Sequence, residues 1–122
     1  MNIVVAGMGY VGLVTGACLS EIGHNVLCVD IDEKKVEVMK SGKSPIYEPG
    51  LDEIIKRNFD AGRLDFTIDY KNVYKNATVV FIGVGTPERE DGSANLDYIF
   101  DVCKQIAENV ENDCLVVVKS TV

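Results

Sequence analysis

The sequence has no tryptophan, one histidine and no long apolar run. No segment reaches the about 18 consecutive apolar residues of a membrane-spanning helix. No basic segment precedes the apolar residues at the amino terminus, so we expect no signal peptide and a cytoplasmic protein. Positive charge is scarce as well, with 12 Lys and Arg against 19 Asp and Glu. The net charge of −7 argues against nucleic acid or an anionic membrane as a partner.

The four cysteines lack the Cys-x-x-Cys spacing of a zinc or redox site. Cys18, Cys28, Cys103 and Cys114 fall on expected helix faces or strands, and we interpret them as reduced, small buried hydrophobic residues. The single histidine, His24, falls in an expected turn, where we expect it to be solvated and not to act as a base for a cysteine. We therefore predict no metal site and no catalytic residue within these 122 residues.

What is present is an ordinary globular composition, 47% hydrophobic and 25% charged, and a length that suits one domain. Asn2–Ala6 is a β-branched apolar run, too short for a helix and typical of a buried parallel strand. The pattern G-x-G-x-x-G follows at Gly7, Gly9 and Gly12, and a helical segment then leads to a second strand, Val26–Val29. This order of strand, glycine turn and helix is the context in which the pattern binds a dinucleotide.

Each glycine of the pattern has its own physical role. Gly7 permits the tight turn, Gly9 lets the backbone approach a pyrophosphate, and Gly12 lets the helix lie close to the strands. The backbone N–H groups of Tyr10 and Val11 then point from the positive end of the helix dipole toward phosphate oxygens. The turn is therefore predicted to hold the diphosphate of a dinucleotide.

An acid follows the second strand at the position where this motif contacts ribose. Asp30 is placed to accept hydrogen bonds from the adenosine ribose hydroxyls and would repel a 2′-phosphate. NAD is therefore predicted as the cofactor in preference to NADP. The nearby Lys34 and Lys35 weaken that preference.

The remaining chain continues the alternation of strands and helices, which predicts a doubly wound, Rossmann-type α/β fold. Its sheet is expected to be mainly parallel, with helices on both faces. The expected elements are a helix from Asp32 to Gly42, a helix from Pro49 to Gly62, a strand at 64–68, a short helix from Asp69 to Tyr74, strands at 77–82 and 114–118, and between those a helix from Asn95.

Helical periodicity also predicts which side chains are buried. The helix after the glycine turn is expected to bury Val11, Val14, Thr15, Cys18, Leu19 and Ile22. The helix from Asn95 is expected to bury Leu96, Ile99, Phe100, Cys103, Ile106, Ala107 and Val110.

Ligands of open α/β sheets bind beyond the carboxyl ends of the strands. Four such ends are informative here, and we expect them to converge on one crevice: Gly7–Gly12, Asp30, Gly83–Pro87 and Ser120–Thr121.

These residues resemble a known family. Beside the glycine motif, the chain contains Glu48-Pro49-Gly50-Leu51, Gly85-Thr86-Pro87 and Ser120-Thr121-Val122 in an order similar to the NAD-binding domain of the UDP-glucose/GDP-mannose dehydrogenases. The resemblance covers residues 1–122. The glycine motif is generic, whereas the other three motifs are specific.

The resemblance implies an enzyme that oxidises the C6 alcohol of a nucleotide sugar to a carboxylate with two NAD, through a thiohemiacetal and a thioester on a cysteine. UDP-glucose, giving UDP-glucuronate, is the first expectation for the substrate. By the same likeness Lys35 joins Asp30 at the adenosine ribose, Gly85 and Thr86 contact the cofactor, and Thr121 lies near the nicotinamide. The catalytic cysteine, its helpers, a central helix and a nucleotide-sugar domain are not found in residues 1–122, so this chain is expected to be an inactive fragment of an enzyme that is homodimeric at full length.

Several alternatives stay open at this point. Lys35 also fits a solvated helix face, Tyr10 fits either the cofactor site or an interdomain contact, and the loop Ser44–Leu51 fits either a cover or a structural turn. GDP-mannose or UDP-N-acetylmannosamine could replace UDP-glucose as the substrate. A non-enzymatic nucleotide-sensing module uses the same opening strand, turn and helix, and a preference for ATP would distinguish it.

Overall fold

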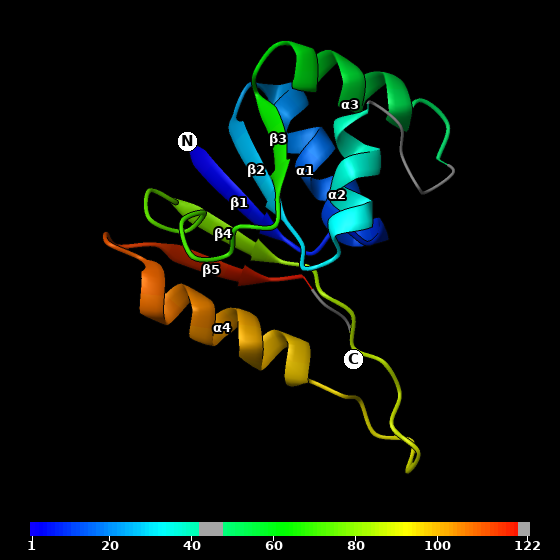
Figure 1. The fold of residues 1–122 in the computed structure, drawn as a ribbon, viewed down its shortest axis with the longest axis vertical. Coiled ribbons are helices and arrows are strands. Elements are labelled where there is room, and N and C mark those ends of the chain that lie inside the picture. The colour runs from blue at the N-terminus through cyan, green and yellow to red at the C-terminus, as the bar shows by residue number, and fades with distance from the viewer. Residues whose placement is uncertain (42–47, 120–122) are drawn as a thin grey trace.

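The computed structural model describes residues 1–41 and 48–119, and its strands form one parallel sheet (Figure 1). The strand order is β3-β2-β1-β4-β5. The strands are β1 (Asn2–Ala6), β2 (Asn25–Val29), β3 (Leu64–Thr67), β4 (Val79–Ile82) and β5 (Leu115–Val118). The opening strand β1 lies at the centre, and its Val5 is placed between Cys28 and Phe81. Because every pairing is parallel, all carboxyl ends lie at one edge, as predicted.

Helices cover both faces of the sheet (Figure 1). On one face lie α1 (Tyr10–Ile22), α2 (Glu33–Lys40) and α3 (Leu51–Asp60), and on the other lies α4 (Asp97–Asn109). Each face has its own hydrophobic core. The first core contains Val5, Leu13, Met39, Ile55 and Phe66, among others. The second contains Val4, Val29, Tyr74, Val80 and Ile106, among others. This arrangement confirms the predicted fold class, and within the described residues no helix is long and apolar enough to cross a membrane.

The predicted buried face of α1 is wrong in part. The helix buries its small residues together with one leucine: Gly12, Leu13, Gly16, Ala17 and Ser20. Among the residues predicted to be buried, Val11, Cys18 and Ile22 are exposed. Val14 and Leu19 are partly buried and pack against the core. The reason is close approach: a Cβ on Gly16 would lie 2.8 Å from the Cys28 sulfur. Small side chains let α1 rest directly on β1 and β2, while Val11, Cys18 and Ile22 lie on the exposed side of the helix.

The predicted buried face of α4 is correct only in part. Ile106 is buried, and Ile99 and Val110 are partly buried, as predicted. The second fully buried residue of α4 is Val102, which the prediction did not include. Phe100 is 63% exposed. The predicted set of buried residues and the observed set both have helical spacing. They differ by a small rotation of the helix about its axis, so periodicity alone does not select between them. Contact with the sheet selects the stripe that contains Val102.

The expected short helix from Asp69 to Tyr74 does not form. Asp69 caps a turn instead: its side chain accepts hydrogen bonds from the backbone N–H groups of Lys71 and Asn72, both at 3.2 Å. The connection from β3 to β4 then places Val73 and Tyr74 in the second core. This correction matters for the site below, because a turn replaces the helix that was expected to lie between these strands.

Other predictions are confirmed with small changes of boundary. Asp32 caps α2, and its side chain accepts hydrogen bonds from the N–H groups of Lys34 and Lys35. Helix α3 begins at Leu51, two residues later than expected, after Gly50 in the left-handed region. Strand β3 lies at the edge of the sheet, as predicted. The Ser44–Tyr47 part of the proline-containing loop and the Gly42 helix stop lie outside the described residues.

Candidate dinucleotide-binding site

The glycine turn after β1 is held by backbone contacts that leave no room for side chains. Gly7 has φ +102°, a conformation that other residues rarely adopt, and a Cβ there would lie 2.8 Å from the Gly83 oxygen. A Cβ on Gly12 would lie 2.0 Å from the Gly7 oxygen. The turn, the first residues of α1 and the end of β4 therefore pack backbone to backbone, which fixes the start of α1 over the carboxyl edge of the sheet.

Gly9 differs from its neighbours, because a Cβ there would meet nothing within 4 Å. Its φ of −74° suits any residue, so neither conformation nor packing in the free protein requires a glycine. Gly9 caps α1 without a side-chain hydrogen bond, and the first turn of α1 contains no acidic residue. The first N–H groups of a helix have no partner inside it. The turn thus presents backbone donors and open space at the positive end of α1, which suits a phosphate group.

Asp30 lies next to this turn, at the end of β2. Its Oδ2 accepts a hydrogen bond from the backbone N–H of Met8 at 2.9 Å, and its Oδ1 accepts one from Asp32 at 2.9 Å. The side chain is half-buried and lines the same cavity as the turn. A carboxylate has about four acceptor positions, so the two oxygens keep capacity for ribose hydroxyls while the backbone holds their orientation.

Lys35 lines the cavity from the first turn of α2, whereas Lys34 does not. Its backbone N–H is 3.4 Å from Asp32 Oδ1. The residue is exposed, so its ammonium group can turn toward a ligand or toward water.

The end of β4 forms the opposite side of the cavity. Gly85 has nothing within 4 Å of its Cβ position and is exposed, and Thr86 beside it is half-buried. Both residues line the cavity. Thr121, the predicted residue near the nicotinamide, lies outside the described residues together with Ser120.

These pieces surround one cavity of about 600 Å³. Three of the four expected strand ends line this cavity. Every described residue predicted for cofactor binding also lines it, except Gly12, which packs against the Gly7 backbone beneath the turn. Sequence reasoning missed a further group of lining residues. They come from the end of β2, the turn after β3, and α4: Ile31, Tyr70, Tyr74, Tyr98, Asp101, Val102 and Gln105. A signal was available for the tyrosines, because Tyr70 closely follows β3 and Tyr98 lies in the first turn of α4.

Tyr10 links the glycine turn to the loop before α3. Its hydroxyl donates a hydrogen bond to Glu48 Oε2 at 3.0 Å. This hydrogen bond, with the negative charge of Glu48, raises the pKa of Tyr10 above its ordinary value. The side chain is 54% exposed and lines the cavity. Tyr10 thus lies at the cavity, and its contact with the cofactor stays a prediction.

The described cysteines differ in their exposure. Cys28 is fully buried, and burial raises the pKa of its thiol to about 12. Cys18 and Cys103 are exposed, so the expectation that all cysteines are buried is wrong for them. The described residues also contain no cluster of His, Cys, Asp or Glu suited to a metal ion.

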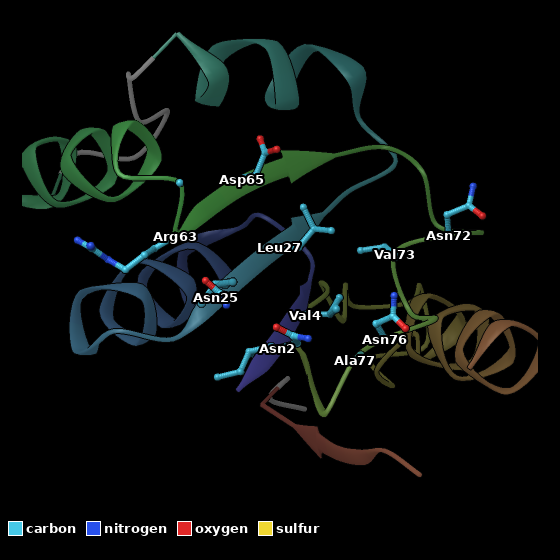
Figure 2. A pocket seen from close by; sticks show the side chains of 13 residues that line it. Asn2, Val4, Asn25, Leu27, Arg63, Asp65, Asn72, Val73, Asn76 and Ala77 are labelled. Carbon is cyan, nitrogen blue, oxygen red and sulfur yellow. The ribbon is translucent and has the colours of Figure 1, made fainter. Parts of the chain in front are cut away.

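A second cavity of about 420 Å³ lies away from this edge, over β1, β2 and β3 (Figure 2). Leu27 and Val73 point toward one another in this view, and four asparagines are among the other lining residues: Asn2, Asn25, Asn72 and Asn76. Asn2 and Asn25 begin their strands, so this cavity extends toward the amino ends, where ligands of open α/β sheets do not bind. The cavity at the carboxyl edge is therefore the candidate site.

Comparison with known proteins agrees with the geometry. The NAD-binding domain model of the UDP-glucose/GDP-mannose dehydrogenase family matches residues 1–122. The chain belongs to this family. NAD is therefore the cofactor of this domain. The glycine turn and the open space at Gly9 fit the diphosphate of NAD, and the oriented Asp30 carboxylate fits its ribose.

Three relatives illustrate the range of this family. UDP-glucose 6-dehydrogenase YwqF of Bacillus subtilis is 54% identical over 122 residues, all of this chain and 28% of that protein. GDP-mannose dehydrogenase of Pseudomonas aeruginosa, solved as a ternary complex, has a TM-score of 0.95 and 42% identity over all of this chain and 29% of its own. UDP-D-ManNAc dehydrogenase of Pyrococcus horikoshii has a TM-score of 0.94 and 31% identity, with the same coverage. The chain thus spans less than a third of these relatives.

Proposed function

We propose that this chain is the NAD-binding domain of a longer nucleotide-sugar dehydrogenase that oxidises UDP-glucose to UDP-glucuronate with two NAD. The observation that supports this most directly is 54% identity over all 122 residues with a UDP-glucose 6-dehydrogenase. In this proposal the enzyme is cytoplasmic and homodimeric and binds neither nucleic acid nor membrane. The acidic charge of the chain supports the last point.

We assign the binding roles to this chain's own residues as follows. The N–H groups of Tyr10 and Val11 hold the diphosphate over Gly7 and Gly9, and Asp30 holds the adenosine ribose, with Lys35 beside it. Gly85 and Thr86 bound the half of the cofactor that faces β4, and Thr121 is proposed for the nicotinamide end. When bound, NAD supplies the hydride acceptor, and the chain positions it at the carboxyl edge of the sheet.

Substrate choice within the family is a separate question. A TM-score of 0.95 to a GDP-mannose dehydrogenase shows that this domain has nearly the same fold in a relative named for a different sugar nucleotide. GDP-mannose and UDP-N-acetylmannosamine are therefore the alternatives to UDP-glucose, and the proposal expects residues outside this domain to discriminate among the three.

Calorimetric titration of the purified chain tests the binding part of the proposal. We expect saturable binding of NAD, weaker binding of NADP and no preference for ATP. No NADH should form when UDP-glucose and NAD are mixed with the chain, because its described residues provide no nucleophile with a base partner. Failure to bind NAD, or a preference for ATP, would contradict the proposal, and so would NADH production by these 122 residues alone.

The substrate part is tested on the longer enzyme. NADH release is measured with UDP-glucose, GDP-mannose and UDP-N-acetylmannosamine in parallel. The proposal expects the highest kcat/KM for UDP-glucose, and a higher value for either other sugar nucleotide would reassign the substrate.

A further inference from the structure

A hydrogen bond joins the start of α1 to the turn that precedes α3. The hydroxyl of Tyr10, the first residue of α1, donates to Glu48 Oε2 at 3.0 Å, although the two residues are 38 positions apart in the chain. The pKa of Tyr10 is raised by this bond and by the charge of Glu48, so the hydroxyl is protonated and able to donate at neutral pH. Both side chains are exposed, and exposed polar contacts contribute little to stability. The stability of the fold therefore depends little on this bond.

Glu48 is a firm anchor for the bond, because the backbone around it forms a fixed turn. The carbonyl oxygen of Glu48 accepts a hydrogen bond from the N–H of Leu51 at 3.0 Å. Between them, Pro49 has a restricted φ and Gly50 adopts φ +82°. Leu51 begins α3 and is buried in the first core. The Glu48 carboxylate is thus attached to the core through one tight turn and a buried side chain.

Tyr10 lines the cavity of the candidate site, whereas Glu48 does not. The Tyr10 side chain is 54% exposed, and the residue directly follows Gly9, where the diphosphate of NAD is proposed to lie. An exposed tyrosine without a partner exchanges between rotamers, and fixing it beside a ligand costs conformational entropy. A tyrosine that a hydrogen bond already holds in one rotamer has less of this entropy to lose.

We infer that Glu48 is a positioning residue for NAD, which acts through the hydroxyl of Tyr10 and holds this side chain in place at the glycine turn. The inference rests on the proposed function, because it assumes that the N–H groups of Tyr10 and Val11 hold the diphosphate. Glu48 makes no contact with NAD itself. Its contribution is that Tyr10 is already ordered when the diphosphate binds, and this lowers the entropic cost of binding.

A second contact between the same two helices provides a matched control. Arg57, in the last turn of α3, donates a hydrogen bond to Glu21, near the end of α1, at 2.6 Å. Both contacts join α1 to the region of α3, one at the amino ends of the helices and the other at their carboxyl ends. Neither Glu21 nor Arg57 lines the cavity. Breaking their contact therefore loosens the same pair of helices without changing Tyr10.

The test measures Kd for NAD by calorimetric titration in the wild type and in variants of Tyr10 and Glu48. Tyr10→Phe and Glu48→Ala each remove the hydrogen bond and should raise Kd about twofold to tenfold, the cost of ordering one side chain on binding. The double variant should bind no more weakly than the weaker single variant, because both changes break the same bond. Glu48→Gln keeps a group that pairs with the hydroxyl and should bind NAD as tightly as the wild type.

Two further measurements separate this role from a structural one. The melting temperatures of the Tyr10 and Glu48 variants should stay within about 5 °C of the wild type, because the bond is exposed. Glu21→Gln, the control at the other end of the helices, should leave Kd for NAD unchanged.

The outcomes distinguish this inference from the proposed function. If the wild type does not bind NAD, both are wrong. If the wild type binds NAD and Tyr10→Phe and Glu48→Ala bind it equally well, the inference alone is overturned. Additive losses in the double variant overturn it too, as does a loss in Glu48→Gln or Glu21→Gln as large as that in Glu48→Ala. Should Tyr10→Phe not fold, the comparison of Glu48→Ala with Glu48→Gln and Glu21→Gln decides the question.

Discussion

Gly9→Ala should separate ligand binding from folding, because Gly9 is the glycine of the turn that the free protein does not need. A Cβ at Gly9 meets nothing within 4 Å, and φ −74° with ψ −169° suits alanine. Alanine is a poorer helix cap than glycine, but it also lowers the entropy of the unfolded chain, and each effect is worth about 0.5–1 kcal/mol with opposite sign. We therefore expect the free energy of unfolding to change by less than about 0.5 kcal/mol.

Binding of NAD by Gly9→Ala should fall sharply. The new methyl group would occupy open space at the turn, where the diphosphate is proposed to lie, next in sequence to the proposed donors Tyr10 and Val11. Hydrogen bonds to a charged group contribute about 1.5–3 kcal/mol each. Loss of one such bond corresponds to a rise in Kd of about tenfold to 150-fold, which calorimetric titration with NAD would measure.

Gly12→Ala provides the matched control. The same methyl group at Gly12 would lie 2.0 Å from the Gly7 oxygen, far inside the 3.0 Å that real contacts respect. The start of α1 must then shift, at a cost of about 3 kcal/mol. In a chain of this size that lowers the melting temperature by roughly 10 °C. The reasoning is refuted if Gly9→Ala binds NAD as tightly as the wild type, or if Gly12→Ala melts at the wild-type temperature.

Three further predictions concern charge and thiol chemistry. Asp30→Asn should raise Kd for NAD about tenfold, because only one of its two terminal side-chain atoms can still accept hydrogen bonds from ribose. The preference for NAD over NADP should also narrow, because the neutral amide does not repel a 2′-phosphate; an unchanged ratio of the two Kd values would contradict this. Glu21 accepts a hydrogen bond from Arg57 at 2.6 Å, and this bond lowers the pKa of Glu21. The ion pair therefore contributes to stability at neutral pH, and the contribution is lost as the pH falls through the lowered pKa of Glu21. Urea unfolding of the wild type and Glu21→Gln should therefore differ at pH 7 and converge in acid, and a difference independent of pH would count against the ion pair. The buried Cys28 thiol, with its pKa of about 12, should resist a disulfide reagent at pH 8 while Cys18 reacts, and equal rates for both would show that the fold opens readily.

Local sequence patterns were sufficient for the central strand, the glycine turn and Asp30. Their properties depend on neighbours in the chain: a β-branched apolar run, glycines at fixed spacing, and an acid at the end of the next strand. The Asp32 cap of α2 also depends on local hydrogen bonds alone. The face that α1 buries was predicted wrongly because periodicity assigns apolar residues to the core, whereas the close approach of α1 to β2 required Gly16 and Ala17 there.

The sequence by itself was sufficient to predict NAD as the cofactor, because the backbone conformation at Gly7 and the charge of Asp30 are properties of single residues and their immediate neighbours. Only the tertiary structure decided that Tyr74, which follows Asp30 by more than forty residues, lines the same cavity as Asp30 and the glycine turn. Parallel pairing in the order β3-β2-β1-β4-β5 brings the turn after β3, the end of β2 and α4 to one edge of the sheet. That proximity depends on which strands pair, and no local pattern around Tyr74 contains this information.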